Sequence, residues 1–133
     1  MPTSSFNVRL DQKSGVPVYR QIIDQVLGAI ASGGLSGGDQ LPTVRQVAVE
    51  LSINPNTVVR AYRELEIRGL VTTQQGIGTF ITPQQVKLDE VERQRQLSRL
   101  VGDFMARAGG EGFSADDVLG RIREFLSEQR RSS

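Results

Sequence analysis

Hydrophobic residues recur at spacings of three and four along several stretches of the chain, and this pattern predicts amphipathic helices. The first stretch opens at Pro17 and ends near Ser32, where two glycines follow. The second covers residues 44–51, and the third begins at Pro55 and stops at Gly69. We expect these three helices to share one core, with a short extended segment at residues 6–10 before them.

Local signals mark where the second and third helices begin. Thr43 stands three residues before Gln46, the spacing of a capping box. Asn54 is a suitable N-cap, and Pro55 fits the first helical position because that position needs no N–H donor. Residues 52–53 supply the turn. Two short helices joined in this way form a helix-turn-helix, whose second helix lies in the major groove of DNA.

A small β-hairpin is predicted directly after the third helix. Residues 70–72 and 79–82 are rich in strand formers, and the polar, glycine-containing segment 73–78 forms the tip. The tip glycines would let the backbone approach phosphates or enter a minor groove, although a hairpin turn alone would also explain them. The hairpin therefore predicts a wing.

The chain changes character after Pro83. One apolar stripe is predicted on a helix over residues 84–108, the glycines at 109, 110 and 112 break it, and Ser114 with Asp117 caps a second helix. Two helices cannot cover both stripes, so we expect a homodimer; packing of the stripes against the winged domain in a monomer is the alternative. The predicted dimerisation residues are Leu97, Leu100, Val101, Phe104, Met105, Val118, Leu119, Ile122, Phe125 and Leu126.

Taken together, the elements predict a mainly α fold with one β-hairpin. Residues 6–83 form a winged helix-turn-helix domain that binds DNA, and residues 84–130 form a short C-terminal helical region for dimerisation.

Composition argues against several classes of protein. The chain has no Cys and no His, so thiolate chemistry and the commonest metal ligand are absent, and we expect no enzyme, no metal site and no cofactor. No segment has the roughly 20 apolar residues of a membrane span, and a cytoplasmic location is expected. Residues 1–83 carry seven Lys or Arg and six Asp or Glu, so DNA binding must be inferred from where the charges lie.

Polar residues at the two helix starts are candidates for DNA contacts. Arg45 is a cation where the helix dipole disfavours one, which a phosphate partner would explain better than solvation. Asn56 and Thr57 are poor helix formers in a first turn, so contact with bases or phosphates is favoured over solvation. For the Asn54 side chain, capping is the better interpretation.

Three motifs in combination identify the chain as similar to a known family. They are L-P-T-x-R-x-x-A at 41–48, N-P-N-T-V-x-R-A-Y-x-E-L-E-x-x-G at 54–69 and Q-x-G-x-G-T-F at 74–80. Residues 6–82 resemble the winged helix-turn-helix domain of the GntR family of bacterial transcription regulators. The short C-terminal part resembles the YtrA subfamily, which lacks the large effector domain of its relatives, so a small-molecule effector stays open.

The resemblance implies which residues touch DNA. The implied contacts are Arg45 in the second helix, Asn54, Asn56, Thr57 and Arg60 in the third, and Gln75, Gly76, Gly78 and Thr79 in the wing. Some larger members of the family carry a second Arg one residue before Arg60, where this chain has Val59.

We therefore predict a sequence-specific, homodimeric transcription regulator that binds a pseudo-palindromic operator of double-stranded DNA. A repressor role and control of a transporter operon follow from the resemblance only. The alternative is a winged helix used for protein contacts, without operator binding.

Overall fold

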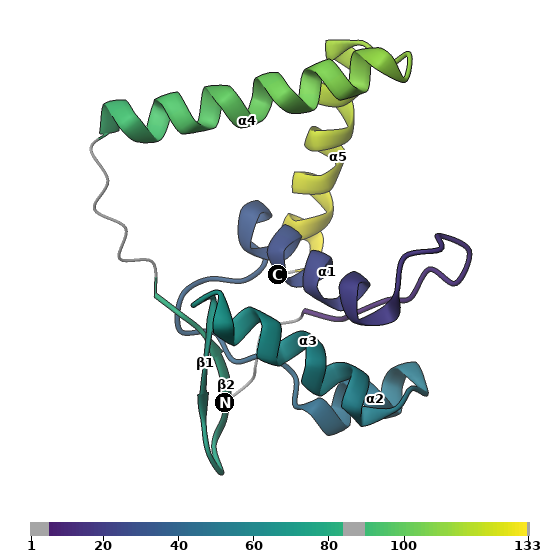
Figure 1. The fold of residues 1–133 in the computed structure, drawn as a ribbon, viewed down its shortest axis with the longest axis vertical. Coiled ribbons are helices and arrows are strands. Elements are labelled where there is room, and N and C mark those ends of the chain that lie inside the picture. Colours follow the sequence, from purple (N-terminus) through teal and green to yellow (C-terminus); the bar gives the residue numbers. More distant parts are fainter. Residues whose placement is uncertain (1–5, 84–89, 133) are drawn as a thin grey trace. The chain divides into compact units, whose positions relative to one another are not determined.

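The computed structural model describes residues 6–83 and 90–132, with side chains up to residue 128. Figure 1 shows the elements of these residues. They are α1 (Val18–Ser32), α2 (Val44–Leu51), α3 (Pro55–Ile67), β1 (Val71–Gln74), β2 (Gly78–Ile81), α4 (Glu90–Gly110) and α5 (Ala115–Ser132). The predicted fold class, mainly α with one β-hairpin, is confirmed. The chain divides into two compact units, one with α1 to β2 and one with α4 and most of α5.

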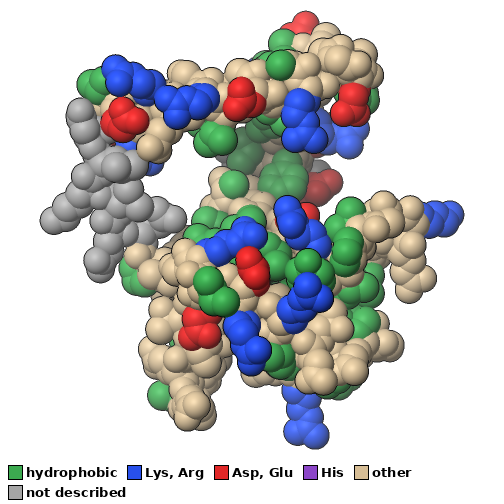
Figure 2. Space-filling view, viewed as in Figure 1, with side chains coloured by type: hydrophobic (Ala, Val, Ile, Leu, Met, Phe, Trp, Pro, Cys, Tyr) green, Lys and Arg blue, Asp and Glu red, His purple; other side chains and the backbone are tan. Residues whose placement is uncertain are grey.

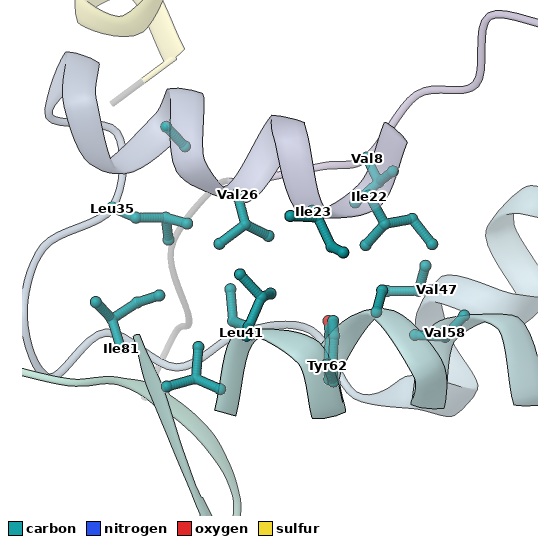
Figure 3. Close-up of a cluster of buried hydrophobic side chains, with 14 of the residues drawn as sticks. Val8, Ile22, Ile23, Val26, Leu35, Leu41, Val47, Val58, Tyr62 and Ile81 are labelled. Atoms are coloured by element: carbon teal, nitrogen blue, oxygen red, sulfur yellow. The ribbon is translucent and has the colours of Figure 1, made fainter. Parts of the chain in front are cut away.

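The core of the first unit lies between α1 and α3. Figure 3 shows apolar side chains from both helices pointing toward one another, joined by side chains from the intervening segments and the hairpin. Ile22, Val58 and Leu65 are each 0% exposed. Helices α2 and α3 pack together, and β1 packs against α3. The outer face of α3 is therefore held in place by apolar packing on its inner face.

Helix α1 begins one residue later than predicted. Pro17 occupies the N-cap with an extended backbone, and Val18 is the first helical residue. Gly33 ends the helix at φ 88°, as predicted. The segment before α1 belongs to no sheet, and side-chain amides of α1 bind its backbone: Arg9 N donates to Gln25 Oε1 at 2.8 Å and Asp11 N donates to Gln21 Oε1 at 2.8 Å.

The two predicted caps of the helix-turn-helix are confirmed. Thr43 Oγ1 accepts from Gln46 N at 3.0 Å, and Thr43 N donates to Gln46 Oε1 at 2.8 Å. Asn54 Oδ1 accepts from Asn56 N at 2.8 Å. Between the helices, Ser52 adopts a left-handed backbone conformation at φ 55°, which turns the chain from α2 into α3.

The strands of the wing extend closer to its tip than the sequence predicts, and the tip is shorter. Strands β1 and β2 pair antiparallel from Val71 with Ile81 to Gln74 with Gly78, so only residues 75–77 form the tip. Predicted tip residues such as Thr73 and Gln74 pair across the hairpin, because the Gly76 backbone at φ 77° allows a tight turn. Residues 38–41 run along the other edge of β2, where Leu41 N donates to Thr79 O at 2.8 Å.

In the second unit, α4 continues through Gly109 and Gly110, so the prediction that these glycines break the helix is wrong. Neither is at positive φ; Gly112 is, at 90°, and the chain turns there. The predicted start at residue 84 lies outside the described residues. Among the described helices, none combines the length and apolar character that crossing a bilayer requires.

The predicted capping box at the start of α5 is confirmed. Asp117 N donates to Ser114 Oγ at 3.1 Å, and Ser114 N donates to Asp117 Oδ2 at 2.8 Å. Hydrogen bonds from the Ser114 backbone and side chain hold the pKa of Asp117 below its ordinary value. The charged form of the carboxylate is thus the one that caps this helix.

Candidate nucleic-acid interface

The outer face of α3 carries a polar stripe along a shallow groove. Asn56, Arg60 and Arg63 follow one another at spacings of four and three residues, so they share one face of the helix. They line a groove of about 300 Å³ together with Val59, Glu64 and Ile67. Arg60 and Arg63 are exposed, so this face is available to a partner.

The first turn of α3 holds the remaining predicted residues of the helix. Asn54 and Asn56 are exposed, and Thr57 is half-buried. The Asn54 side-chain oxygen is used by the cap, which agrees with its interpretation as a capping residue. The first turn of α3 contains no acidic residue, so no carboxylate there would repel a phosphate.

Arg45 lies beside the start of α3. It is the second residue of α2 and is exposed, in a first turn without acidic residues. Arg45 and Pro55 both line a hollow of about 410 Å³, together with apolar residues of α2 and Ile53. The structure thus places the guanidinium-bearing residue of α2 close to the N-terminal turn of α3.

The cations of this surface are not neutralised by the chain's own acids. Among the described residues, Arg45, Arg60 and Arg63 have no carboxylate within 4.0 Å. Glu64, one turn after Arg60, pairs instead with Arg68 at 3.4 Å. Figure 2 shows basic side chains spread over the visible face of the unit that contains α1 to β2. An unpaired, exposed guanidinium can bind a phosphate or a base edge.

Tyr62 fixes the position of α2 relative to α3. Its hydroxyl donates to Pro42 O at 2.6 Å, immediately before the capping residue of α2, and the residue is 5% exposed. Burial raises the pKa of the Tyr62 phenol, so the group stays a protonated donor. Tyr62 thus belongs to the core of the first unit.

The tip of the wing is exposed, and one of its two glycines makes room for a side chain of the same domain. Gln75 and Gly76 are exposed. A Cβ on Gly78 would collide with the Gln40 side chain, whose Nε2 donates to Ile77 O at 3.2 Å. Glycine at position 78 therefore leaves room for the Gln40 side chain under the wing, while no described atom would obstruct a Cβ on Gly76.

Thr79 is bound to the hairpin more than the sequence suggests. It is half-buried, and its hydroxyl pairs with that of Thr73 across the strands at 3.4 Å. Of the four predicted wing residues, Gln75 and Gly76 are thus the ones most open to a partner.

Two residues of the site were missed from the sequence. Arg63 follows Asn56 by seven residues, and this helical spacing alone could have identified it. Gln40 carries no sequence signal for its role, because it reaches the wing from 37 residues away along the chain.

The apolar residues of the second unit lie mostly at its surface. Helices α4 and α5 meet near residues 111–114 and then diverge (Figure 1), so neither covers the other's stripe. Leu100 is 67% exposed, Phe104 56% and Ile122 51%. Of the ten predicted residues, only Met105 and Val118 are half-buried. A hollow of about 820 Å³ opens between the two helices, lined by Phe104, Phe113, Ile122 and two arginines among others.

Within the described ranges, no group of three or more acidic residues could hold a metal ion. The surface of α2, α3 and the wing combines exposed polar side chains with Arg45, Arg60 and Arg63, which form no ion pair among the described residues.

Comparison with known proteins gives a consistent result. Residues 18–81 match the model of the family described as bacterial regulatory proteins, gntR family. The chain is 35% identical over 113 residues to YhcF of Bacillus subtilis, an uncharacterized HTH-type transcriptional regulator, covering 85% of the chain and 93% of YhcF. It is 43% identical over 75 residues to the HTH-type transcriptional repressor YtrA of Bacillus subtilis, which covers 56% of the chain and 58% of YtrA.

A solved structure agrees with these relatives. YtrA from Sulfolobus acidocaldarius, a GntR-family transcription factor, is similar with a TM-score of 0.54 and 30% identity, covering 74% of this chain and 97% of that chain. The relatives are transcription regulators rather than enzymes.

Proposed function

Because the chain belongs to the GntR family and is a DNA-binding transcription regulator, we propose that it acts as a homodimeric repressor on a pseudo-palindromic operator. Residues 6–83 bind the operator and residues 84–130 hold the dimer together. The protein works in the cytoplasm, where the DNA that it regulates lies. The comparisons do not favour a winged helix used for protein contacts alone.

The observation that carries the proposal is the exposed polar surface of α2 and α3, whose arginines form no ion pair among the described residues. Arg45 and the residues Asn56, Thr57 and Arg60 are the proposed contacts, with Arg63 added from the structure. An α-helix fits the major groove, where side chains from its N-terminal part reach base edges. The N-cap Asn54 fixes this end of the helix, and its free amide can also approach the DNA backbone.

The wing is proposed to lie in the adjacent minor groove. Gln75 and Gly76 form the exposed tip, and the absence of a Cβ at Gly76 allows close approach to the sugar-phosphate backbone. Gly78 and Thr79 serve mainly to place this tip, since Gly78 accommodates Gln40 and Thr79 pairs with Thr73.

Dimerisation is supported by the exposed apolar faces of α4 and α5. Contiguous apolar surface of this kind usually marks an interface. A two-fold axis through it would present two recognition helices to half-sites of one palindrome. We propose that the hollow between the helices is filled by apolar side chains of the second copy, and we therefore assign no effector to it.

A repressor role is supported by the similarity to the repressor YtrA of Bacillus subtilis. A dimer bound over a promoter would exclude the polymerase by occupying the same DNA. This requires only operator binding, and no additional domain.

Selection from a random pool of double-stranded DNA tests operator binding. We expect enrichment of one sequence with two-fold symmetry and half-sites spaced by about one helical turn, roughly 34 Å, or a multiple of it. Enrichment of no sequence by the purified, folded protein would contradict the proposal and favour the protein-interaction module.

Replacing Arg45 with alanine tests the contact made by α2. We expect weaker binding to the selected operator at every base sequence, and a slope of log affinity against log salt that falls by about one, because one phosphate contact is lost. Fluorescence anisotropy at several salt concentrations measures both quantities.

Arg99→Ala is the matched control for this change. Arg99 is exposed on α4, on the face opposite the apolar stripe, and its loss removes the same charge from the other unit. An unchanged salt slope in Arg45→Ala, or an equal change in Arg99→Ala, would remove Arg45 from the interface.

A further inference from the structure

The guanidinium of Arg60 stacks on an aromatic ring. Its Cζ lies 3.7 Å from the centroid of the Tyr19 ring, well inside the range of a cation–π contact. Tyr19 is the second residue of α1 and is half-buried, whereas Arg60 lies in the second turn of α3 and is exposed. The contact thus joins a residue outside the helix-turn-helix to the proposed DNA-reading face.

Stacking leaves the hydrogen-bonding capacity of Arg60 available. The N–H donors of a guanidinium lie in its plane, so a ring against one face does not consume them. No carboxylate occupies these donors either. Among the described residues none lies within 4.0 Å of Arg60, and the nearby Glu64 pairs with Arg68. In the stacked position Arg60 still lines the groove along α3.

From this geometry we infer that Tyr19 is a positioning residue for operator binding, which holds Arg60 in place before DNA arrives. A free arginine side chain loses rotamer freedom when it binds, and this loss weakens binding. Tyr19 reduces the loss, because its own ring is fixed by packing against the core of the first unit. This inference rests on the proposed function, since it requires Arg60 to contact DNA.

A double-mutant cycle on the full chain tests the inference with the selected operator as probe. Tyr19→Leu is expected to weaken binding by about threefold to tenfold, the range that corresponds to ordering one long side chain. In the Arg60→Ala background the same substitution is expected to have no further effect, because the side chain that Tyr19 positions is gone. Tyr19→Phe keeps the aromatic face and should bind within about twofold of the wild type.

The cycle separates positioning from a structural role. If Tyr19→Leu weakened binding equally with and without the Arg60 side chain, its effect would be general damage to the fold, and the inference would be overturned. Stronger binding by Tyr19→Leu would also overturn it, because the ring would then be restraining Arg60 away from DNA.

The outcomes also distinguish this inference from the proposed function. If the wild type bound the operator but Arg60→Ala bound equally well, the inference would fail while operator binding stood. If the wild type bound no double-stranded DNA, the proposed function itself would fail.

Discussion

Ile122→Asp is expected to convert the dimer to a monomer and to weaken operator binding by about a hundredfold or more. Ile122 is 51% exposed on the apolar face of α5, and the proposed dimer would bury it. An aspartate there would place a charge in an apolar interface without a partner. A monomer keeps every contact with one half-site but loses the second, which the dimer binds at high effective concentration.

Sedimentation equilibrium gives the mass, which should fall from twice the 14.6 kDa of the chain to that of one chain. Ser127→Asp is the matched control, because Ser127 lies about half a turn away around the same helix and is exposed. Fusing the Ile122→Asp chain to a parallel coiled coil should restore tight binding if only the dimer was lost. A wild-type chain that is monomeric at every concentration would refute the dimer and favour the packed-back monomer.

The elements that the sequence predicted well are those with local signals. Thr43 with Gln46, Asn54 with Pro55, and Ser114 with Asp117 each combine a cap with an apolar stripe beginning at once, and all three starts agree with the structure. In each pair the two residues lie within four positions of each other along the chain. The local sequence therefore contains both partners of the signal.

Boundaries that depend on glycine were predicted less well. Glycine permits a left-handed backbone without requiring it, so Gly109 and Gly110 could remain helical while Gly112 turned the chain. Gly76 likewise allowed the strands of the wing to extend closer to the tip than their composition suggested.

Contacts between distant segments could not be predicted from periodicity. Tyr62 with Pro42, Gln40 with Ile77, and Arg60 with Tyr19 join residues that come together only once the core has formed. These contacts set the geometry of the proposed interface. Candidate side chains for DNA binding were therefore visible in the sequence, whereas what holds them in place was not.

Truncation of one buried side chain in the core that creates these contacts should destabilise the fold. Leu65→Ala is expected to lower the free energy of unfolding by about 2–5 kcal/mol, because the lost apolar contacts and the remaining cavity both destabilise the fold. Leu65 is 0% exposed in α3, the helix against which α1, α2 and β1 all pack. For a domain of this size the melting temperature should fall by about 10 °C or more.

Ile67→Ala is the matched control, two residues along the same helix. Ile67 is 76% exposed and lies on the outer groove, so its truncation should change the unfolding free energy by less than about 0.5 kcal/mol. Urea unfolding of the full chain at one protein concentration compares the two variants without a change in dimer population. Equal effects of the two substitutions would mean that α3 is not packed on its Leu65 side, and the placement of Arg60 over Tyr19 and of α2 through Tyr62 would then lose its support.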